Sequence, residues 1–234
     1  MNRHTAIITG ATRGFGRAMA LAFARAGHRV LGIYANDGQA AAQLEKDLAG
    51  SDSLVLRHDV SIIDDGFWSR AEIQDAQSLV LIHNACAPFT PMPFHLLRWA
   101  DFETSLNVGL KGSWSSARAV VRPMLRAGQG TIVNVLTAAV SGLPAKGFAA
   151  YATAKHAVRG LTLALAAEYS GKGIRTFSVS PGFMATELTA GWDARLVEAI
   201  RSHGPVSDPT IAAERVRELV ESPTVPGNGE DYPV

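Results

Sequence analysis

The chain has 234 residues, of which 47% are hydrophobic and 18% are charged, and its formal net charge is +1. This length and composition predict one globular domain with a large core, a size that a single α/β sheet readily reaches. The near-zero charge, without a basic block, argues against nucleic acid and anionic membranes as partners, and no apolar run approaches a membrane span. The single cysteine, Cys86, excludes an internal disulfide and fits a reducing compartment, so we expect a cytoplasmic protein.

Apolar runs that indicate buried strands alternate with helical patterns along the whole chain. The expected strands are residues 5–9, 29–34, 54–57, 79–82, 131–136 and 174–179. Helices are expected directly after residue 16 and at 39–48, 101–127 and 148–171, whereas residues 61–77 give only a weak helical pattern. This alternation predicts a Rossmann-type, doubly wound parallel sheet with helices on both faces, in a single domain over residues 1–234. Ligands of such sheets lie outside the carboxyl ends of the strands.

Three glycines, Gly10, Gly14 and Gly16, stand between the first expected strand and the helix that follows it. Such glycines let backbone N–H groups approach a pyrophosphate, and the helix N-terminus adds a partial positive charge. Their spacing differs from the common G-x-G-x-x-G fingerprint, and a tight turn that needs positive φ is the alternative explanation. The strand before them and the immediate helix after them favour a dinucleotide cofactor.

A tyrosine and a lysine lie four residues apart, at Tyr151 and Lys155, within an expected helix. Positions four apart share one face of a helix, so the phenol and the ammonium can reach one pocket. A nearby Lys⁺ stabilises a phenolate, so we expect the pKa of Tyr151 to fall below its usual value of about 10. On its own the pair is also common surface decoration, but its position downstream of the glycine turn favours acid–base catalysis by the tyrosine.

Together these features resemble the short-chain dehydrogenase/reductase family in its compact single-domain form, and the resemblance covers nearly the whole chain. Residues 9–16 are similar to the family's T-G-x-x-x-G-x-G cofactor turn, and Tyr151 and Lys155 to its Y-x-x-x-K motif. Shorter matches are Asp59-Val60, Asn84-Ala85 with Cys86 in place of a glycine, Asn107, and Pro181-Gly182. The resemblance implies cofactor contacts from Gly10, Thr12, Arg13, Gly14, Phe15, Gly16, Asn36, Asp59, Val60, Asn84, Ala85, Cys86, Tyr151, Lys155, Pro181, Gly182 and Thr186.

The family's catalytic serine has no direct counterpart in this chain. Counted thirteen residues back from Tyr151, its position falls on Ala138, which has no hydroxyl. Residues 132–137 instead resemble the family's I-V-N-I-S-S strand, which puts Thr137 in place of the serine and requires one extra residue in the following loop. Because loops tolerate insertions better than strands do, we prefer Thr137, with Ser141 as a third candidate.

Charge at the end of the second strand predicts the choice of cofactor. An NAD-preferring site usually ends this strand with a carboxylate, but here the strand runs into Asn36, and the next acid, Asp37, is expected to lie past the site. Arg13, directly before Gly14, can supply the positive charge that a 2′-phosphate needs. We therefore predict NADP(H), and we expect no metal because the histidines lack metal-ligand spacing.

The resemblance implies an NADP(H)-dependent oxidoreductase that reduces a ketone, above all a β-ketoacyl thioester carried by coenzyme A or a carrier protein. Tyr151 would donate the proton and Thr137 would stabilise the developing oxyanion. By the same resemblance, Asn107 would hold a water that links Lys155 to solvent. Two other classes stay open. One is a non-catalytic or weakly active subunit that pairs with an active paralogue, and the other is an NADP(H)-binding regulatory module.

Residues 183–205, which include Trp192, are expected to form a mobile segment that covers the substrate. The long helices at 101–127 and 148–171 carry small and apolar residues on more than one side, which covering the sheet would not bury completely. We therefore expect a homodimer or homotetramer, with a heteromer as the alternative. Relatives commonly add a last strand, and Pro233 would place any such strand at the sheet edge.

Overall fold

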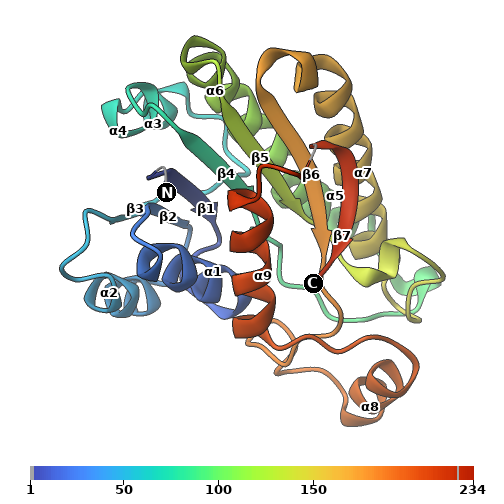
Figure 1. The fold of residues 1–234 in the computed structure, drawn as a ribbon. Coiled ribbons are helices and arrows are strands. Elements are labelled where there is room, and N and C mark those ends of the chain that lie inside the picture. Colours follow the sequence, from blue (N-terminus) through green and yellow to red (C-terminus); the bar gives the residue numbers. More distant parts are fainter. Residues whose placement is uncertain (1–2, 226) are drawn as a thin grey trace.

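A computed structural model describes residues 3–225 and 227–234 of the chain. Within them, seven parallel strands form one sheet in the order β3-β2-β1-β4-β5-β6-β7, with helices on both faces (Figure 1). The strands are β1 (Thr5–Thr9), β2 (Arg29–Tyr34), β3 (Leu54–Arg57), β4 (Leu79–His83), β5 (Gly130–Val135), β6 (Ile174–Ser180) and β7 (Asn228–Pro233). The predicted doubly wound parallel fold is confirmed, and the strand order reverses between β1 and β4.

The helices alternate with the strands as the sequence pattern indicates. They are α1 (Gly14–Arg25), α2 (Gly38–Asp47), α3 (Asp65–Trp68), α4 (Ala71–Gln74), α5 (Trp99–Leu106), α6 (Gly112–Ala127), α7 (Ala149–Tyr169), α8 (Ala194–His203) and α9 (Pro209–Glu221). A π-helical turn, η2 (Asn107–Lys111), joins α5 to α6, and short 3-10 turns lie at η1 (Phe94–Leu96), η3 (Ala138–Val140) and η4 (Ser170–Lys172). In the part of the chain described here, we find no helix with the length and apolar character that crossing a membrane demands.

The sheet is buried on both faces because side chains alternate along each strand. In β1, Ala6 and Ile8 point to one face of the sheet and belong to a core cluster that includes Phe23 of α1. Ile7 points to the other face and belongs to a second cluster that includes Met124 of α6. Figure 1 shows α1 and α9 on one side of the sheet and α6 and α7 on the other. Continuous apolar strands are the expected result of burial on two faces.

The seventh strand, β7, lies at the edge of the sheet and pairs only with β6 in the described structure. It is polar, and its Asp231 carboxylate accepts hydrogen bonds from the hydroxyls of Ser178 and Ser180 at 2.8 and 2.7 Å. The sequence analysis predicted six strands from their apolar runs, and β7 was not among them because it has no apolar run. Pro233 does lie in an edge strand, as expected for a residue that lacks a backbone N–H.

Candidate active site

The glycine turn between β1 and α1 has a geometry that only glycine allows. Gly10 and Gly14 have positive φ values of 65° and 47°. A Cβ on Gly16 would lie 2.0 Å from the carbonyl oxygen of Gly10, so even alanine would force the turn open. Arg13 caps α1 without a side-chain hydrogen bond to the first turn, so no side chain competes for these N–H groups. The turn therefore fits a pyrophosphate, as a dinucleotide cofactor requires.

The end of β4 holds this turn in place. The Asn84 side-chain amide donates hydrogen bonds to the carbonyls of Thr9 and Gly10 at 3.1 and 3.2 Å. In return, the Thr9 hydroxyl accepts from the backbone N–H groups of Asn84 and Ala85 at 3.1 and 3.0 Å. Asn84 is thus engaged with the backbone of the glycine turn, and its predicted contact with the cofactor stays a prediction.

The other residues predicted to contact the cofactor follow the carboxyl ends of the strands. Asn36 follows β2, Asp59 and Val60 follow β3, Ala85 and Cys86 follow β4, and Pro181 and Gly182 follow β6. Asp59 accepts hydrogen bonds from the backbone and the hydroxyl of Ser61 at 2.9 and 2.7 Å. Thr12 and Phe15 are buried, and Phe15, in the first turn of α1, packs in the core. These residues lie at one edge of the sheet, but the side chain of Phe15 packs into the core instead of facing the cofactor site.

Arg13 and Asp37 form an ion pair across this edge. The second Asp37 oxygen accepts a hydrogen bond from the N–H of Ala40 at 3.0 Å and so caps α2. The sequence analysis placed Asp37 past the cofactor site, whereas the structure holds it against Arg13. The pairing arises because the turn after β2 brings the start of α2 back beside the glycine turn.

Thr137, Tyr151 and Lys155 come together at the carboxyl end of β5. Thr137 follows β5 in an extended conformation, and a side-chain hydrogen bond joins it to Tyr151. Lys155 Nζ lies 5.8 Å from the centre of the Tyr151 ring and donates a 2.7 Å hydrogen bond to the carbonyl of Val135. Ser141, by contrast, is exposed beyond η3. The geometry favours Thr137 over Ser141 as the hydroxyl that acts with the tyrosine.

Burial sets the acid–base properties of these groups. It raises the pKa of Tyr151, the nearby Cys86 thiol adds to the rise, and the hydrogen bond from Thr137 opposes it. The expectation that Lys155 lowers this pKa is wrong here, because desolvation of the phenolate is the largest effect and the net shift of the pKa is upward. Burial also lowers the pKa of Lys155 and raises that of Cys86. Tyr151 is a protonated phenol at neutral pH, which is the form that donates a proton.

Asn107 is the first residue of the π-helical turn η2, which packs against α7. A Cβ on Gly109 in this turn would lie 3.6 Å from the Cβ of Ala154, one residue before Lys155. The sequence predicted one continuous helix over this region, and the π turn leaves no signature in a 3.6-residue pattern. The structure thus brings η2 beside the helix that carries Tyr151 and Lys155, and the role of Asn107 stays a prediction.

A buried histidine that the sequence left unassigned lies behind the site. His83 is the last residue of β4, and its Nδ1 lies 3.3 Å from the hydroxyl of Thr9. Burial and the charge of Lys155 lower the pKa of His83 to about 3, while the backbone of Val108 and Gly109 acts in the opposite direction. The imidazole is therefore neutral at physiological pH.

Residues 183–205, the cover segment, form a closed loop over the strand ends. The N–H of Phe183 donates to the carbonyl of Pro205 at 2.8 Å, and the N–H of Ser207 donates to the carbonyl of Phe183 at 2.9 Å. A Cβ on Gly182 would lie only 2.3 Å from the Pro205 carbonyl oxygen, so this close approach needs glycine. The two ends of the segment therefore meet at Gly182, and its mobility stays a prediction.

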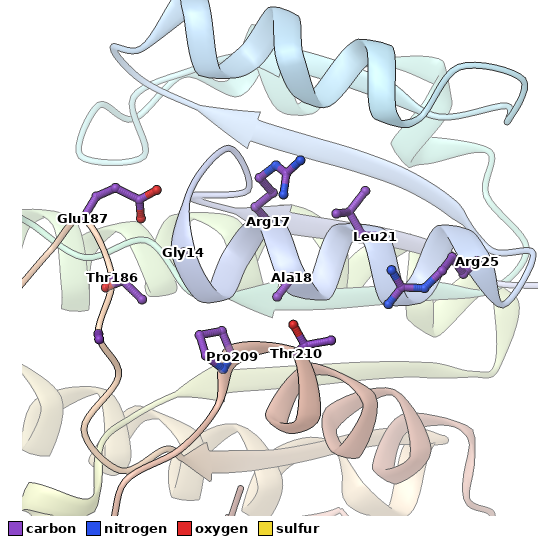
Figure 2. A pocket seen from close by; sticks show the side chains of 10 residues that line it. Gly14, Arg17, Ala18, Leu21, Arg25, Thr186, Glu187, Pro209 and Thr210 are labelled. Carbon is purple, nitrogen blue, oxygen red and sulfur yellow. The ribbon is translucent and has the colours of Figure 1, made fainter.

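A cavity of about 450 Å³ runs along α1, between this helix, the cover segment and the start of α9 (Figure 2). Gly14 and Thr186 lie at the end nearest the glycine turn, and a Cβ on Gly14 would come within 3.2 Å of the Thr186 side chain. The arginines along it are paired, Arg17 with Asp47 at 2.5 Å and Arg25 with Glu214 at 2.9 Å. These ion pairs hold both arginine side chains along the wall of the cavity.

A second cavity, of about 430 Å³, reaches Tyr151. Its walls come from the loop after β4, from α5, from the start of α7 and from the cover segment, and they include Phe89, Met92, Leu97 and Trp192. Trp192 was singled out from the sequence, but Phe89 was not, because one apolar residue in a loop produces no periodic pattern. A substrate carbonyl can meet Tyr151 only from such a cavity. Among the described residues, no group of three or more potential metal ligands comes together.

Comparisons with known proteins agree with this geometry. The sequence matches the family described as short chain dehydrogenase over residues 4–196. A 3-oxoacyl-[acyl-carrier-protein] reductase from Synechocystis sp. is 28% identical over 228 residues, which cover 95% of this chain and 91% of that protein.

Two solved structures have the same fold. A putative NAD(P)-dependent gluconate 5-dehydrogenase from Beutenbergia cavernae, with bound NADP, superposes with a TM-score of 0.87 at 28% identity, covering 98% of this chain and 94% of that chain. A 3-ketoacyl-(acyl-carrier-protein) reductase from Brucella melitensis, complexed with NADH, has a TM-score of 0.87 at 25% identity and covers 100% of this chain and 96% of that chain. With the glycine turn, the Tyr151–Lys155 pair and a family match over most of its length, this chain belongs to the short-chain dehydrogenase/reductase family of oxidoreductases, which use a nicotinamide cofactor.

Proposed function

We propose that the chain is an NADP(H)-dependent ketoreductase that reduces a β-ketoacyl thioester to the secondary alcohol. The observation that carries this proposal is the hydrogen-bonded pair of Thr137 and Tyr151, beside Lys155 and open to the cavity of about 430 Å³. NADPH supplies the hydride when bound. Tyr151 donates its proton to the developing alkoxide, and Thr137 hydrogen-bonds the same oxygen.

The thioester part of the proposal is supported by the similarity to the Synechocystis protein, which is named as a 3-oxoacyl-[acyl-carrier-protein] reductase. The thioester would be carried by coenzyme A or by a carrier protein. We place the reaction in the cytoplasm, because a single cysteine suits a reducing compartment.

The preference for NADP(H) is supported by the pairing of Arg13 with Asp37. One carboxylate oxygen of Asp37 pairs with Arg13 and the other accepts a hydrogen bond from the N–H of Ala40, so the negative charge of this acid is already balanced within the protein. The Arg13 side chain is 54% exposed and keeps guanidinium N–H groups for a 2′-phosphate.

The activity is tested by following NADPH consumption with a panel of β-ketoacyl thioesters and small ketones. An enzyme of the proposed kind consumes NADPH with at least one thioester when the purified chain is alone. Binding of NADPH without consumption would favour a regulatory module, and activity that appears only with a paralogue would favour a non-catalytic subunit.

The cofactor preference is tested by titration. We expect NADPH to bind at least tenfold tighter than NADH, a difference of about 1.4 kcal/mol. Arg13→Ala should remove most of this preference with little effect on NADH. Arg17→Ala is the matched control, because Arg17 lies one turn further along α1 and is paired with Asp47. Equal affinities of the wild-type chain for the two cofactors would refute the assignment.

A further inference from the structure

Two aromatic rings contact the ring of Tyr151, and a third ring, that of Trp192, packs against both of them. Phe89, in the loop after β4, stacks on Tyr151 with 4.6 Å between ring centres and 14° between planes. Phe148, which precedes α7, meets Tyr151 edge-on at 5.8 Å and 90°. Trp192 of the cover segment contacts Phe89 at 5.2 Å and Phe148 at 5.3 Å. The four rings form one cluster at the proposed proton donor.

A hydrogen bond fixes the arrangement of this cluster. The indole N–H of Trp192 donates to the backbone carbonyl of Phe89 at 3.2 Å. This bond joins the cover segment to the loop after β4, so the two aromatic walls of the cavity have a defined spacing. Rings that are held in this way present fixed faces and edges to the cavity. Aromatic pairs prefer defined stacked or edge-to-face geometries, so we expect such walls to favour a substrate ring over a flexible alkyl chain.

Within the described residues, the remaining walls of the cavity offer no cation to a negatively charged substrate. Among its lining residues the only ionisable side chain besides Tyr151 is Asp101, whose carboxylate accepts hydrogen bonds from the backbone and the guanidinium of Arg98 at 2.8 and 3.3 Å. The hydroxyls of Thr104 and Ser105 donate to backbone carbonyls of their own helix. A substrate carboxylate would meet no cation in this cavity and would lie near an acidic side chain.

We propose that the reduced ketone carries an aromatic ring close to its carbonyl, as in a 3-oxo-3-arylpropanoyl thioester, and that Phe89 and Trp192 determine this specificity. The inference rests on the proposed ketoreductase function and narrows its substrate class. The carbonyl lies at Tyr151 and Thr137, and the aryl group packs against Phe89 and Trp192, which line the cavity, while the buried ring of Phe148 supports both from behind. A sugar acid finds no partner for its carboxylate, and a short alkyl ketone leaves the rings without contact.

The test compares two thioesters of N-acetylcysteamine that differ only in the group beyond the ketone, 3-oxo-3-phenylpropanoyl and 3-oxobutanoyl. With NADPH and the wild-type chain, we expect kcat/KM to be at least tenfold higher for the phenyl compound. Phe89→Leu keeps an apolar side chain but removes the ring, and it should bring this ratio below about threefold, because the ring contact that favours the phenyl compound is lost. Phe94→Leu is the matched control, because Phe94 is 72% exposed in the same loop and should leave the ratio unchanged.

The outcomes separate this inference from the function on which it rests. If the wild-type chain reduces both thioesters equally, or Phe89→Leu keeps the wild-type ratio, the aromatic specificity is refuted while the ketoreductase proposal stands. If neither thioester is reduced, quenching of tryptophan fluorescence in the NADPH complex reports binding of each. Tenfold tighter binding of the phenyl compound would then support the aromatic site and refute the thioester reduction. Equal binding would refute both.

Discussion

At the scale of single residues, we propose that the Thr137 hydroxyl takes the place of the serine that the family commonly uses. A threonine hydroxyl donates the same hydrogen bond, but its extra methyl restricts χ1, so the pocket must accept one rotamer. Loss of one donor aimed at a developing oxyanion costs about 10²-fold or more in turnover. We therefore expect Thr137→Val to lose at least that much in kcat while it binds NADPH normally, and Thr137→Ser to keep most activity.

Ser141 provides the contrast for this prediction. It is exposed beyond η3, whereas Thr137 is hydrogen-bonded to Tyr151, so Ser141→Ala should be nearly as active as the wild-type chain. A nearly inactive Ser141→Ala variant together with an active Thr137→Val variant would show that the hydroxyl comes from the loop.

His83 should make the fold sensitive to acid. Its pKa is lowered to about 3 in the folded chain, whereas an unfolded histidine titrates near 6.5. Between these values the unfolded state binds the extra proton, so the free energy of unfolding rises with pH and is lost as the pH falls from about 6.5 towards 3. At pH 4.5 the penalty amounts to about 2–3 kcal/mol.

Urea unfolding between pH 4 and 8 measures this effect. His83→Asn cannot take up the proton, so its stability should fall less steeply towards acid pH than that of the wild-type chain. His95→Asn is the control, because His95 is exposed, and it should follow the wild-type curve. A His83→Asn curve parallel to the wild-type curve would contradict the prediction.

At the scale of elements, the residues of buried strands could be predicted and those of polar or irregular elements could not. β1 and β2 match the predicted ranges, because strands buried on both faces are short continuous apolar runs. β7 was not among the predicted strands, since its sequence, Asn-Gly-Glu-Asp-Tyr-Pro, has no apolar pattern. Residues 61–77 contain two four-residue helices, which are too short to show a helical period.

The site could be predicted only where a motif fixes chemistry at a set spacing. The glycine turn and the pair Tyr151–Lys155 have such spacings, and the fold brings them to one edge of the sheet. The ring of Phe89 and the contact of Arg13 with Asp37 depend on how loops fold back, which no local pattern encodes. The pKa of Tyr151 depends on burial, and burial is a property of the assembled site.

Arg175 of β6 joins the sheet to the end of α9. Its guanidinium donates to the carbonyls of Val220 and Ser222 and to the Thr131 hydroxyl, the last two at 2.8 and 3.0 Å. Arg175→Met would leave these acceptors without their charged donor, so we expect a loss of about 2–4 kcal/mol in the free energy of unfolding, measured in urea. Arg122→Met, at an exposed position of α6, should cost less than about 0.5 kcal/mol.

At the scale of the whole molecule, we expect a homodimer or homotetramer. Some of the small residues of α7 are buried within the single chain, namely Ala150, Ala152, Ala154 and Ala166. The outward face of α7 is still small and apolar, and Gly160, Leu163 and Ala164 are exposed on it. Such a face permits close approach of a second helix.

Light scattering at micromolar concentration measures the assembly. Ala164→Arg places a long charged side chain on this face, so we expect it to shift the chain towards monomers, while Arg159→Ala, also exposed on α7, should leave the assembly intact. A wild-type chain that is already monomeric would contradict the prediction.

The strand order also bears on how the chain acquires its fold. β1 lies inside the sheet, and Thr5 pairs with Arg29 on one side and with Leu79 on the other. During synthesis, β1 therefore keeps one bare edge until β4 has left the ribosome. A sheet in which each neighbour is reached through a crossover has a high contact order, which slows folding and prolongs the exposure of unpaired apolar strands. Refolding from denaturant should accordingly be slow, and its yield should fall as the protein concentration rises.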